Sequence, residues 1–326
     1  MRVLVTGGAG YVGSVSVEAL LAAGHEVIVL DDLSTGHRDS LPSAVAAVAG
    51  SVTDGTLLRE LMERQRTDAV LHCAARSLVG ESISDPALYF RENVGGGMTL
   101  LDAMRATGVA RLVFSSSASV YGDPETTPVT EDAALRPISP YGETKRAFEA
   151  MLAWYGRAYG LRSISLRYFN AAGATASNGE DHDPETHLIP SVVAAALGRR
   201  ELVLFGDDYP TPDGTPIRDY IHVADLADAH LLALDATAEG GGAEAFNLGS
   251  GRGFSVREVL AAAEAATGRS IPHRVGPRRE GDPPVLVASA ERAQASLGWR
   301  ARRGSLEEMV GSAWAWAQRH PAGYEG

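Results

Sequence analysis

The stretch RVLVTGGAGYVG, residues 2–13, opens the chain with a short apolar run and a glycine-rich turn. The apolar run is rich in β-branched residues and predicts a buried strand, and residues 15–23 predict a helix. A second apolar strand, residues 26–30, ends at Asp31. A strand, a glycine-rich turn, a helix and a second strand ending in an acid are together typical of a βαβ unit that binds a dinucleotide.

Each part of this unit has a physical task in holding a dinucleotide. The glycines let backbone N–H groups approach a pyrophosphate, and the helix N-terminus adds a partial positive charge. The carboxylate of Asp31 can accept hydrogen bonds from both ribose hydroxyls of an adenosine and would repel a 2′-phosphate. We therefore expect NAD rather than NADP. An ordinary glycine-rich turn is the alternative, and it would not need all of these parts together.

Composition and charge narrow the class of protein. The chain has 326 residues, enough for one or two domains, and its formal net charge of −12 argues against a nucleic-acid partner. No apolar run is long enough to span a bilayer, and no signal-peptide pattern precedes the first strand. The single cysteine, Cys73, cannot form an internal disulfide, which fits a reducing cytoplasm. We expect a cytoplasmic protein with no membrane partner.

Strand and helix patterns alternate through the first half of the chain. Strands are predicted at 69–74, 111–116 and 162–168, and helices at 57–64, 86–106 and 139–159. This alternation predicts an α/β fold with a doubly wound parallel sheet, the Rossmann architecture, in which ligands lie at the carboxyl ends of the strands.

The pattern changes after a polar loop at residues 171–187. Short strands are expected near 201–205, 244–248 and 272–275, and helices near 188–198, 223–236, 255–267 and 305–318; residues 240–242 predict a surface turn. We expect an NAD-binding Rossmann domain at residues 1–169 and a smaller α/β substrate-binding domain at 170–326. The boundary is soft, because later segments can return to the first domain.

Tyr141 and Lys145 lie four residues apart in SPYGETK, residues 139–145, and so share one face of a predicted helix. A nearby ammonium lowers the pKa of a tyrosine from about 10, which would let Tyr141 act as a general base. Such pairs are also common on exposed helix faces, so the neighbouring motifs matter. Ser115, Ser116 and Ser117 end a predicted strand, where a hydroxyl can bridge a substrate oxygen and the phenol or simply cap the strand.

With the glycine-rich turn, the strand-end serines and the Tyr–Lys pair, the chain resembles the extended short-chain dehydrogenases/reductases. Over essentially its whole length it resembles the UDP-glucose 4-epimerases (UDP-galactose 4-epimerases) of that family. The runs that indicate only the superfamily are residues 5–13, 114–122 and 139–145. The runs more specific to the epimerases are residues 205–211, 213–223 and 277–282, with 167–170 before them.

The resemblance implies a reaction in which the sugar is oxidised and reduced again at C4. By this resemblance, Tyr141 would accept the proton of the sugar 4-hydroxyl, and Ser117 would hydrogen-bond to the same oxygen. Lys145 would bind the nicotinamide ribose and adjust the pKa of Tyr141. Hydride would pass to NAD, the 4-keto sugar would rotate, and hydride would return to its other face. The resemblance also implies a homodimer, paired through the helices around 90–106 and 141–159.

The resemblance implies cofactor contacts along the carboxyl edge of the sheet. The residues are Gly7, Gly10, Tyr11, Val12, Gly13, Asp31, Asp32, Ser51, Val52, Ala74, Asn93, Ser115, Tyr141, Lys145, Tyr168 and Phe169. The contacts to the UDP-sugar are Ser117, Tyr141, Asn170, His187, Leu188, Val203, Phe205, Arg218, Tyr220, Arg279, Asp282 and Leu286.

Within the substrate set, Val203 and Phe205 match a uracil pocket, two arginines match diphosphate contacts, and Asp282 matches a ribose acceptor. Each arginine taken alone would be an ordinary surface charge. Four positions depart from the family. Ser51 replaces an aspartate, Ser77 replaces a lysine, His187 replaces an asparagine, and Leu286 is intermediate in size at the position that gates N-acetylated sugars.

Other activities fit the sequence less well. Dehydratases of this superfamily carry an acid pair directly after the catalytic hydroxyl residue, where this chain has Ala118 and Ser119. A related nucleotide-sugar epimerase, one that prefers UDP-N-acetylhexosamines for example, or a simple dehydrogenase stays open, and a non-catalytic NAD sensor would not need the Ser–Tyr–Lys set. No serine-hydrolase motif is present, and His182 and His187 lie in a polar loop without zinc-ligand spacing, so we expect no metal. His222 is expected to be a packed structural histidine.

Overall fold

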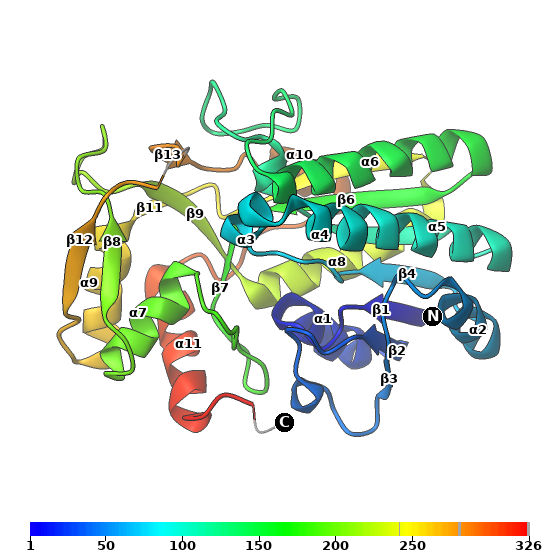
Figure 1. Cartoon of the computed structure of the whole chain (residues 1–326), viewed down its shortest axis with the longest axis horizontal. Helices are drawn as coiled ribbons and strands as arrows, with labels where there is room; N and C mark the ends of the chain where they lie inside the picture. The colour runs from blue at the N-terminus through cyan, green and yellow to red at the C-terminus, as the bar shows by residue number, and fades with distance from the viewer. Residues whose placement is uncertain (241, 280–281, 325–326) are drawn as a thin grey trace.

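In the computed structural model, the described residues are 1–240, 242–279 and 282–324 (Figure 1). The middle of the predicted turn at 240–242 and two residues of the 277–282 run, Glu280 and Gly281, therefore lie outside the described residues.

A parallel sheet forms the centre of the larger region, and seven strands belong to it within the described residues. Their order across the sheet is β10 (Ala243–Leu248), β6 (Arg162–Tyr168), β5 (Arg111–Ser117), β4 (Ala69–His72), β1 (Arg2–Thr6), β2 (Glu26–Asp31) and β3 (Ala46–Ala49). The direction of winding reverses between β1 and β4, which is where doubly wound sheets bind ligands. The predicted Rossmann-type α/β fold is confirmed.

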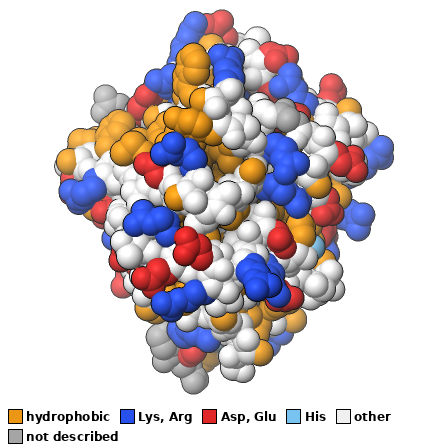
Figure 2. Space-filling model, turned by 90° about the vertical axis from the view of Figure 1, so that its right-hand side faces the viewer, with side chains coloured by type: hydrophobic (Ala, Val, Ile, Leu, Met, Phe, Trp, Pro, Cys, Tyr) orange, Lys and Arg blue, Asp and Glu red, His pale blue; other side chains and the backbone are white. Residues whose placement is uncertain are grey.

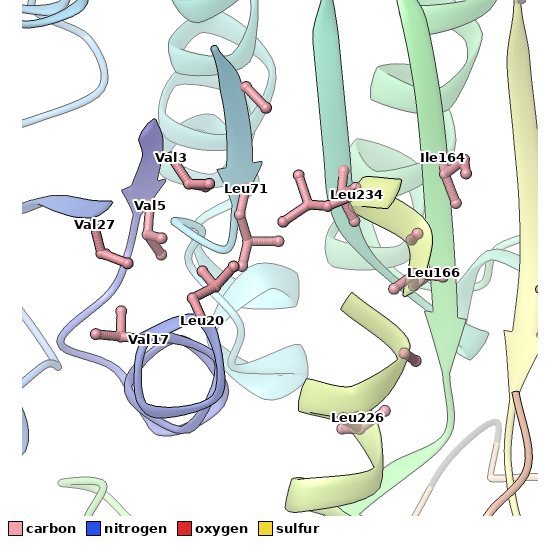
Figure 3. Packing of buried hydrophobic residues seen from close by; sticks show 14 of the residues in the cluster. Val3, Val5, Val17, Leu20, Val27, Leu71, Ile164, Leu166, Leu226 and Leu234 are labelled. Atoms are coloured by element: carbon pink, nitrogen blue, oxygen red, sulfur yellow. The ribbon is translucent and has the colours of Figure 1, made fainter. Parts of the chain in front are cut away.

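Helices cover both faces of this sheet (Figure 1). On one face lie α1 (Tyr11–Ala22) and α8 (Val223–Glu239), and on the other lie α2 (Gly55–Gln65), α5 (Gly96–Thr107) and α6 (Pro140–Tyr159). Figure 3 shows Val17 and Leu20 of α1 and Leu226 of α8 meeting the apolar side chains of the strands. Burial of this surface is the main favourable contribution to the fold.

A second, smaller α/β region lies at the left of Figure 1. Its strands are β7 (Asn170–Ala172), β8 (Leu202–Phe205), β9 (Ile217–His222), β11 (Gly253–Ser255), β12 (His273–Gly276) and β13 (Val285–Leu286), and its helices are α7 (Leu188–Ala196), α9 (Val256–Thr267) and α11 (Leu306–Arg319). The chain does not divide cleanly at residue 169, because α8 and β10 from the later half complete the central sheet, with the short helix α10 (Glu291–Leu297) packed against them. The division into a Rossmann domain at 1–169 and a substrate domain at 170–326 remains a proposal, with α8 and β10 as later segments that return to the first domain.

Several segments differ in detail from the sequence-based expectation. The helix predicted at 86–106 is divided into α4 (Pro86–Tyr89), a π-helical turn at Phe90–Gly95 and α5. A π-helical turn changes the directions of its side chains and is common at functional sites. A short helix, α3 (Val79–Ser84), precedes it. No helix of the described residues is long and apolar enough to cross a membrane.

Candidate active site

The glycines in the turn between β1 and α1 are required for different reasons. A Cβ on Gly7, whose φ is +71°, would lie 2.4 Å from the backbone nitrogen of Ala74, and a Cβ on Gly13 would lie 2.0 Å from the carbonyl oxygen of Gly7. Side chains are therefore excluded there by the protein itself. Gly10 differs, because the nearest atom to a Cβ would be the Gly7 oxygen at 3.5 Å. This leaves room at the N-terminus of α1 for an anionic ligand.

Asp31 joins the turn to the end of β2. Its carboxylate accepts hydrogen bonds from the backbone N–H of Ala9, at 2.8 Å, and of Leu33, at 2.9 Å. Burial raises the pKa of this carboxyl. Asp32 is exposed and accepts only from the N–H of Ser34, 3.0 Å away. Asp31 is thus the better placed of the two acids to hold a ribose, as expected for NAD.

Ser117, Tyr141 and Lys145 come together at the carboxyl end of β5 and the first turns of α6. All three are buried, and the ammonium of Lys145 donates a 2.8 Å hydrogen bond to the carbonyl oxygen of Ser115. Ser139 begins α6 by accepting from the N–H of Gly142. This cap places both side chains of the helix next to the strand end.

The prediction that Lys145 lowers the pKa of Tyr141 is wrong in this structure. Burial raises the pKa of the Tyr141 phenol, and its interaction with Ser117 opposes only part of that rise. Burial also lowers the pKa of the Lys145 amine to about 8. The ammonium lies 5.7 Å from the centroid of the Tyr141 ring and bonds to backbone rather than to the phenol. Removal of water therefore outweighs the neighbouring charge.

A buried ion pair that sequence analysis missed holds α6 against the sheet. Arg167 of β6 donates two-pronged hydrogen bonds to the carboxylate of Glu149, the shorter of 2.5 Å, and their side chains are only 6% and 9% exposed. Ser116 donates to the same carboxylate, and Arg167 also donates to the hydroxyl of Tyr121. The two charged residues are 18 positions apart, so only the packing of helix on strand reveals the pair.

Asn93 is expected at the cofactor, and the structure shows its amide bonded within the protein. Its Oδ1 accepts from the N–H of Arg76 at 2.8 Å, and its Nδ2 donates to the carbonyl oxygen of Arg76 and to Thr144, both at 3.0 Å. The residue comes from the π-helical turn. It thus ties the loop after β4 to α6, beside the Tyr–Lys pair.

The other cofactor candidates lie at the ends of β1, β3, β4, β5 and β6 or in the segments that follow them. Tyr11 is buried and donates to the carbonyl oxygen of Gly173, and Ser115 Oγ lies 3.1 Å from Cys73 Sγ and 3.0 Å from His230 Nε2. Ser51 bonds to Thr53, 2.8 Å away, next to the loop that starts α2. The remaining candidates are Val12 and Val52, which are half-buried, Ala74, which donates its N–H to Thr6, and Tyr168 and Phe169 at the end of β6.

Apart from Ser117 and Tyr141, the substrate candidates are spread over β7, β8, β9, β13, the start of α7 and the chain between β12 and β13. Two of them are paired with each other, since Arg218 donates to Asp282 at 2.5 Å. The guanidinium of Arg279 lies 4.2 Å from the centroid of the Phe205 ring. Asn170 donates to the carbonyl oxygen of Asp219 at 2.9 Å. The charged groups therefore face the same region and make internal contacts there.

The remaining substrate candidates frame this region. Leu286 lies opposite Arg218 in the β13–β9 register, Tyr220 is buried on β9, and Val203 is half-buried on β8. Leu188 begins α7, and His187 directly precedes it. His222 is buried, with its Nδ1 accepting from the N–H of Ala224 and its Nε2 3.2 Å from Ser312, as expected for a structural histidine.

Asp219 is a further residue that sequence analysis missed. It is fully buried, and its carboxylate accepts from the backbone N–H groups of Ser250, Gly251 and Ala288 and from the hydroxyl of Ser250. These bonds hold the chain after β10 and the chain after β13 against β9. Asp219 therefore supports the strand that carries Arg218 and Tyr220.

A sheet of this order, with a glycine-rich turn at the point where the winding reverses, defines a dinucleotide-binding protein of the Rossmann class. The chain belongs to the NAD dependent epimerase/dehydratase family, which residues 3–249 match. It is 51% identical to the UDP-glucose 4-epimerase of Halalkalibacterium halodurans over 99% of this chain and 98% of the relative.

Solved structures agree with this family. The chain resembles the UDP-glucose 4-epimerase of Brucella ovis in complex with NAD, with a TM-score of 0.94, 48% identity and coverage of 97% and 98% of the two chains. It also resembles the UDP-glucose 4-epimerase of Bifidobacterium longum in complex with NAD+ and UDP, with a TM-score of 0.94, 36% identity and coverage of 99% and 100%.

Proposed function

We propose that this protein is an NAD-dependent UDP-sugar 4-epimerase that interconverts UDP-glucose and UDP-galactose. The observation that carries the proposal is the convergence of Ser117, Tyr141 and Lys145 at the same edge of the sheet as the glycine-rich turn. Full-length relatives that are named UDP-glucose 4-epimerase support the choice of substrate.

The chain's own residues suit NAD. The space beside Gly10 accepts the pyrophosphate, Asp31 holds the adenosine ribose, and Lys145 holds the nicotinamide ribose. When bound, NAD supplies a hydride acceptor and a positive charge on its nicotinamide ring. That charge matters here because burial by itself raises the pKa of Tyr141.

Tyr141 takes the proton from the sugar 4-hydroxyl while Ser117 fixes the same oxygen. The hydroxyl of Ser117 accepts from the backbone N–H of Ser119 and donates to Ser119 Oγ, both at 3.1 Å, and rotation of the hydroxyl would turn its proton toward a ligand. With the hydride of C4 taken up and later returned to the other face of the sugar by bound NAD, Tyr141 would return the proton to the oxygen once the 4-keto sugar has rotated, and C4 would be inverted. Ala118 and Ser119 offer no carboxyl group for elimination of water, which favours epimerisation over dehydration.

The UDP moiety is held by the smaller region. Arg218 and Arg279 bind the diphosphate, Asp282 accepts from the uridine ribose, and Phe205 with Val203 forms the apolar surface for uracil. Binding then exchanges the Arg218–Asp282 ion pair for contacts to the ligand. Asn170, His187, Leu188, Tyr220 and Leu286 complete the surroundings of the sugar and the diphosphate.

The protein also acts as a homodimer in this proposal. Large apolar side chains are exposed on α3, the π-helical turn, α5 and α6, namely Val79, Ile83, Phe90, Met98, Trp154 and Tyr159. Figure 2 shows hydrophobic side chains gathered near the top of the face on which α5 and α6 end. Pairing of these helices with a second copy would cover them. The lone Cys73 is consistent with a reducing cytoplasm as the place of action.

The test is to incubate the purified protein with UDP-galactose, without added NAD, and to follow UDP-glucose. The proposal expects turnover with no stoichiometric release of NADH. Release of NADH with each sugar oxidised would instead indicate a dehydrogenase. A parallel assay with UDP-N-acetylgalactosamine determines whether Leu286 admits the acetamido group, and light scattering gives the oligomeric state.

A further inference from the structure

Four potential metal ligands meet in the loop between β7 and α7. Glu180, His182, Glu185 and His187 each offer one nitrogen or oxygen atom, and these four atoms all lie within 4.8 Å of one another. We propose that they form a divalent metal site whose ion is Zn²⁺. The site is separate from the Ser–Tyr–Lys set, and it shares only His187 with the residues proposed to surround the substrate.

The distances between the ligand atoms suit tetrahedral coordination. Bonds of about 2.0–2.1 Å from Zn²⁺ to histidine nitrogen or carboxylate oxygen place neighbouring ligand atoms about 3.3 Å apart. Glu180 Oε1 lies 3.2 Å from His182 Nδ1 and 2.7 Å from His187 Nδ1. Glu185 offers its two oxygens at 3.0 Å from His187 Nδ1 and 3.9 Å from His182 Nδ1. These separations lie on both sides of the expected value, so small side-chain movements complete the geometry.

Burial and charge also favour a cation here. The side chains of Glu180 and Glu185 are only 6% and 14% exposed, and among the described residues neither forms an ion pair with a lysine or an arginine. Two carboxylates in such a place are costly without positive charge; in the structure that charge comes from His187, whose pKa, despite burial, the carboxylates raise to about 10, and a bound metal ion would displace that proton. A divalent ion with two neutral imidazoles makes the site electrically neutral. Two nitrogens and two oxygens form a ligand set that Zn²⁺ accepts.

A cavity lies beside the proposed metal site, and a bound ion would order the loop that carries its ligands. A cavity of about 130 Å³ is lined by Glu180, His182 and Glu185 and gives an ion a path of entry. Asp181, in the same loop, accepts a hydrogen bond from the N–H of Tyr324 in the C-terminal segment. His187 directly precedes α7. A bound ion therefore fixes the loop to the start of α7, and Asp181 connects the same loop to the C-terminal segment.

The experiment uses the full chain after dialysis against a chelator. Titration with Zn²⁺, read against a chromophoric competitor, should give one equivalent per chain and a rise in Tm. His182→Asn and Glu180→Gln should each weaken binding more than about 100-fold, because loss of a direct ligand costs more than loss of a group supporting one. His320→Gln removes a histidine that lines the same cavity outside the ligand set, and should leave affinity unchanged.

Co²⁺ provides a readout that does not require a variant to fold. In place of Zn²⁺, it should give the strong visible absorption of a four-coordinate nitrogen and oxygen site. Absence of a saturable equivalent in the wild-type chain would overturn the proposal. So would an affinity that survives both ligand substitutions, or one that falls equally with His320→Gln. Circular dichroism of each variant separates loss of the site from loss of the fold.

Discussion

The carboxyl edge of the central sheet and the strands of the smaller region that carry the proposed substrate contacts hold their polar side chains in different ways. At the sheet, Lys145, Glu149 and Arg167 are buried and bonded to other parts of the chain. In the smaller region, Arg218 and Asp282 bond to each other and Arg279 lies over Phe205, which is 39% exposed. The half proposed to carry the chemistry is thus built in advance, whereas the half proposed to bind the substrate makes contacts that a ligand can replace.

The largest expected effect tests whether the prebuilt half carries the chemistry. Tyr141→Phe removes one buried hydroxyl and keeps the ring, so we expect the turnover of UDP-galactose to fall about 10²–10⁴-fold. Bound nicotinamide and the unfolding midpoint should change little. Full activity in this variant would show that another group is the base.

The next effect concerns stability rather than catalysis. Arg167→Met leaves the buried carboxylate of Glu149 without its partner, and we expect a loss of about 3–5 kcal/mol in the free energy of unfolding. Urea denaturation measures it. The double variant Arg167→Met/Glu149→Leu should recover most of that loss, and Arg136→Ala, in an exposed pair, should cost less than about 1 kcal/mol. Equal costs for the two arginines would contradict the comparison.

In the binding half, the same kind of change should affect affinity instead. Arg218→Ala should raise KM for UDP-galactose about 10–100-fold, since hydrogen bonds between charged groups contribute about 1.5–3 kcal/mol. Stability should change much less than with Arg167→Met. The matched control is Arg278→Ala, because Arg278 pairs with the exposed Asp208 and has no proposed ligand contact. If Arg218→Ala destabilises the fold and spares KM, the two halves do not differ as described.

The smallest effect is a difference in pH dependence. His230 is buried and neutral between Ser115 and the carbonyl oxygen of Leu226, and burial lowers its pKa from 6.5 to about 4. The His230 ring is therefore protonated below about pH 6.5 in the unfolded chain, but only below about pH 4 in the folded chain. Stability conferred by the neutral ring is complete above that window and decreases by about 1.4 kcal/mol per pH unit within it.

His230→Gln removes the contribution of this ring to the pH dependence of the free energy of unfolding. The difference in free energy of unfolding between wild type and variant should shrink as the pH falls from about 7 to about 5. Urea titrations across this range measure it, with the exposed His273→Gln as the control. A constant difference would show that the buried ring does not resist protonation.

Much of the prebuilt half could be predicted from the sequence, because its signals are local. The turn at Gly7 and Gly13 follows from backbone sterics, and Tyr141 with Lys145 follows from helix periodicity. The strand β3 was missed, since three of its four residues are alanines, which are depleted in strands, and a single valine is too little signal to mark it. The pKa shift of Tyr141 was predicted with the wrong sign, because the degree of burial cannot be read from spacing.

Contacts that depend on tertiary packing were beyond the reach of pattern reasoning. Glu149 and Arg167 meet only because α6 lies on β6, and Asp219 finds its donors in two later segments. The four ligands of the proposed metal site lie close together in sequence. Their spacing matches no familiar motif, and the path of the loop alone brings them together.

The edge strand β10 links completion of the fold to the order of synthesis. Until residues 243–248 have left the ribosome, β6 keeps an open side with unpaired backbone groups. Before α8 has emerged, the apolar surface that it covers on β5 and β6 also stays exposed to water. A nascent chain stopped at residue 169 would therefore be a client for chaperones rather than a free-standing nucleotide-binding module.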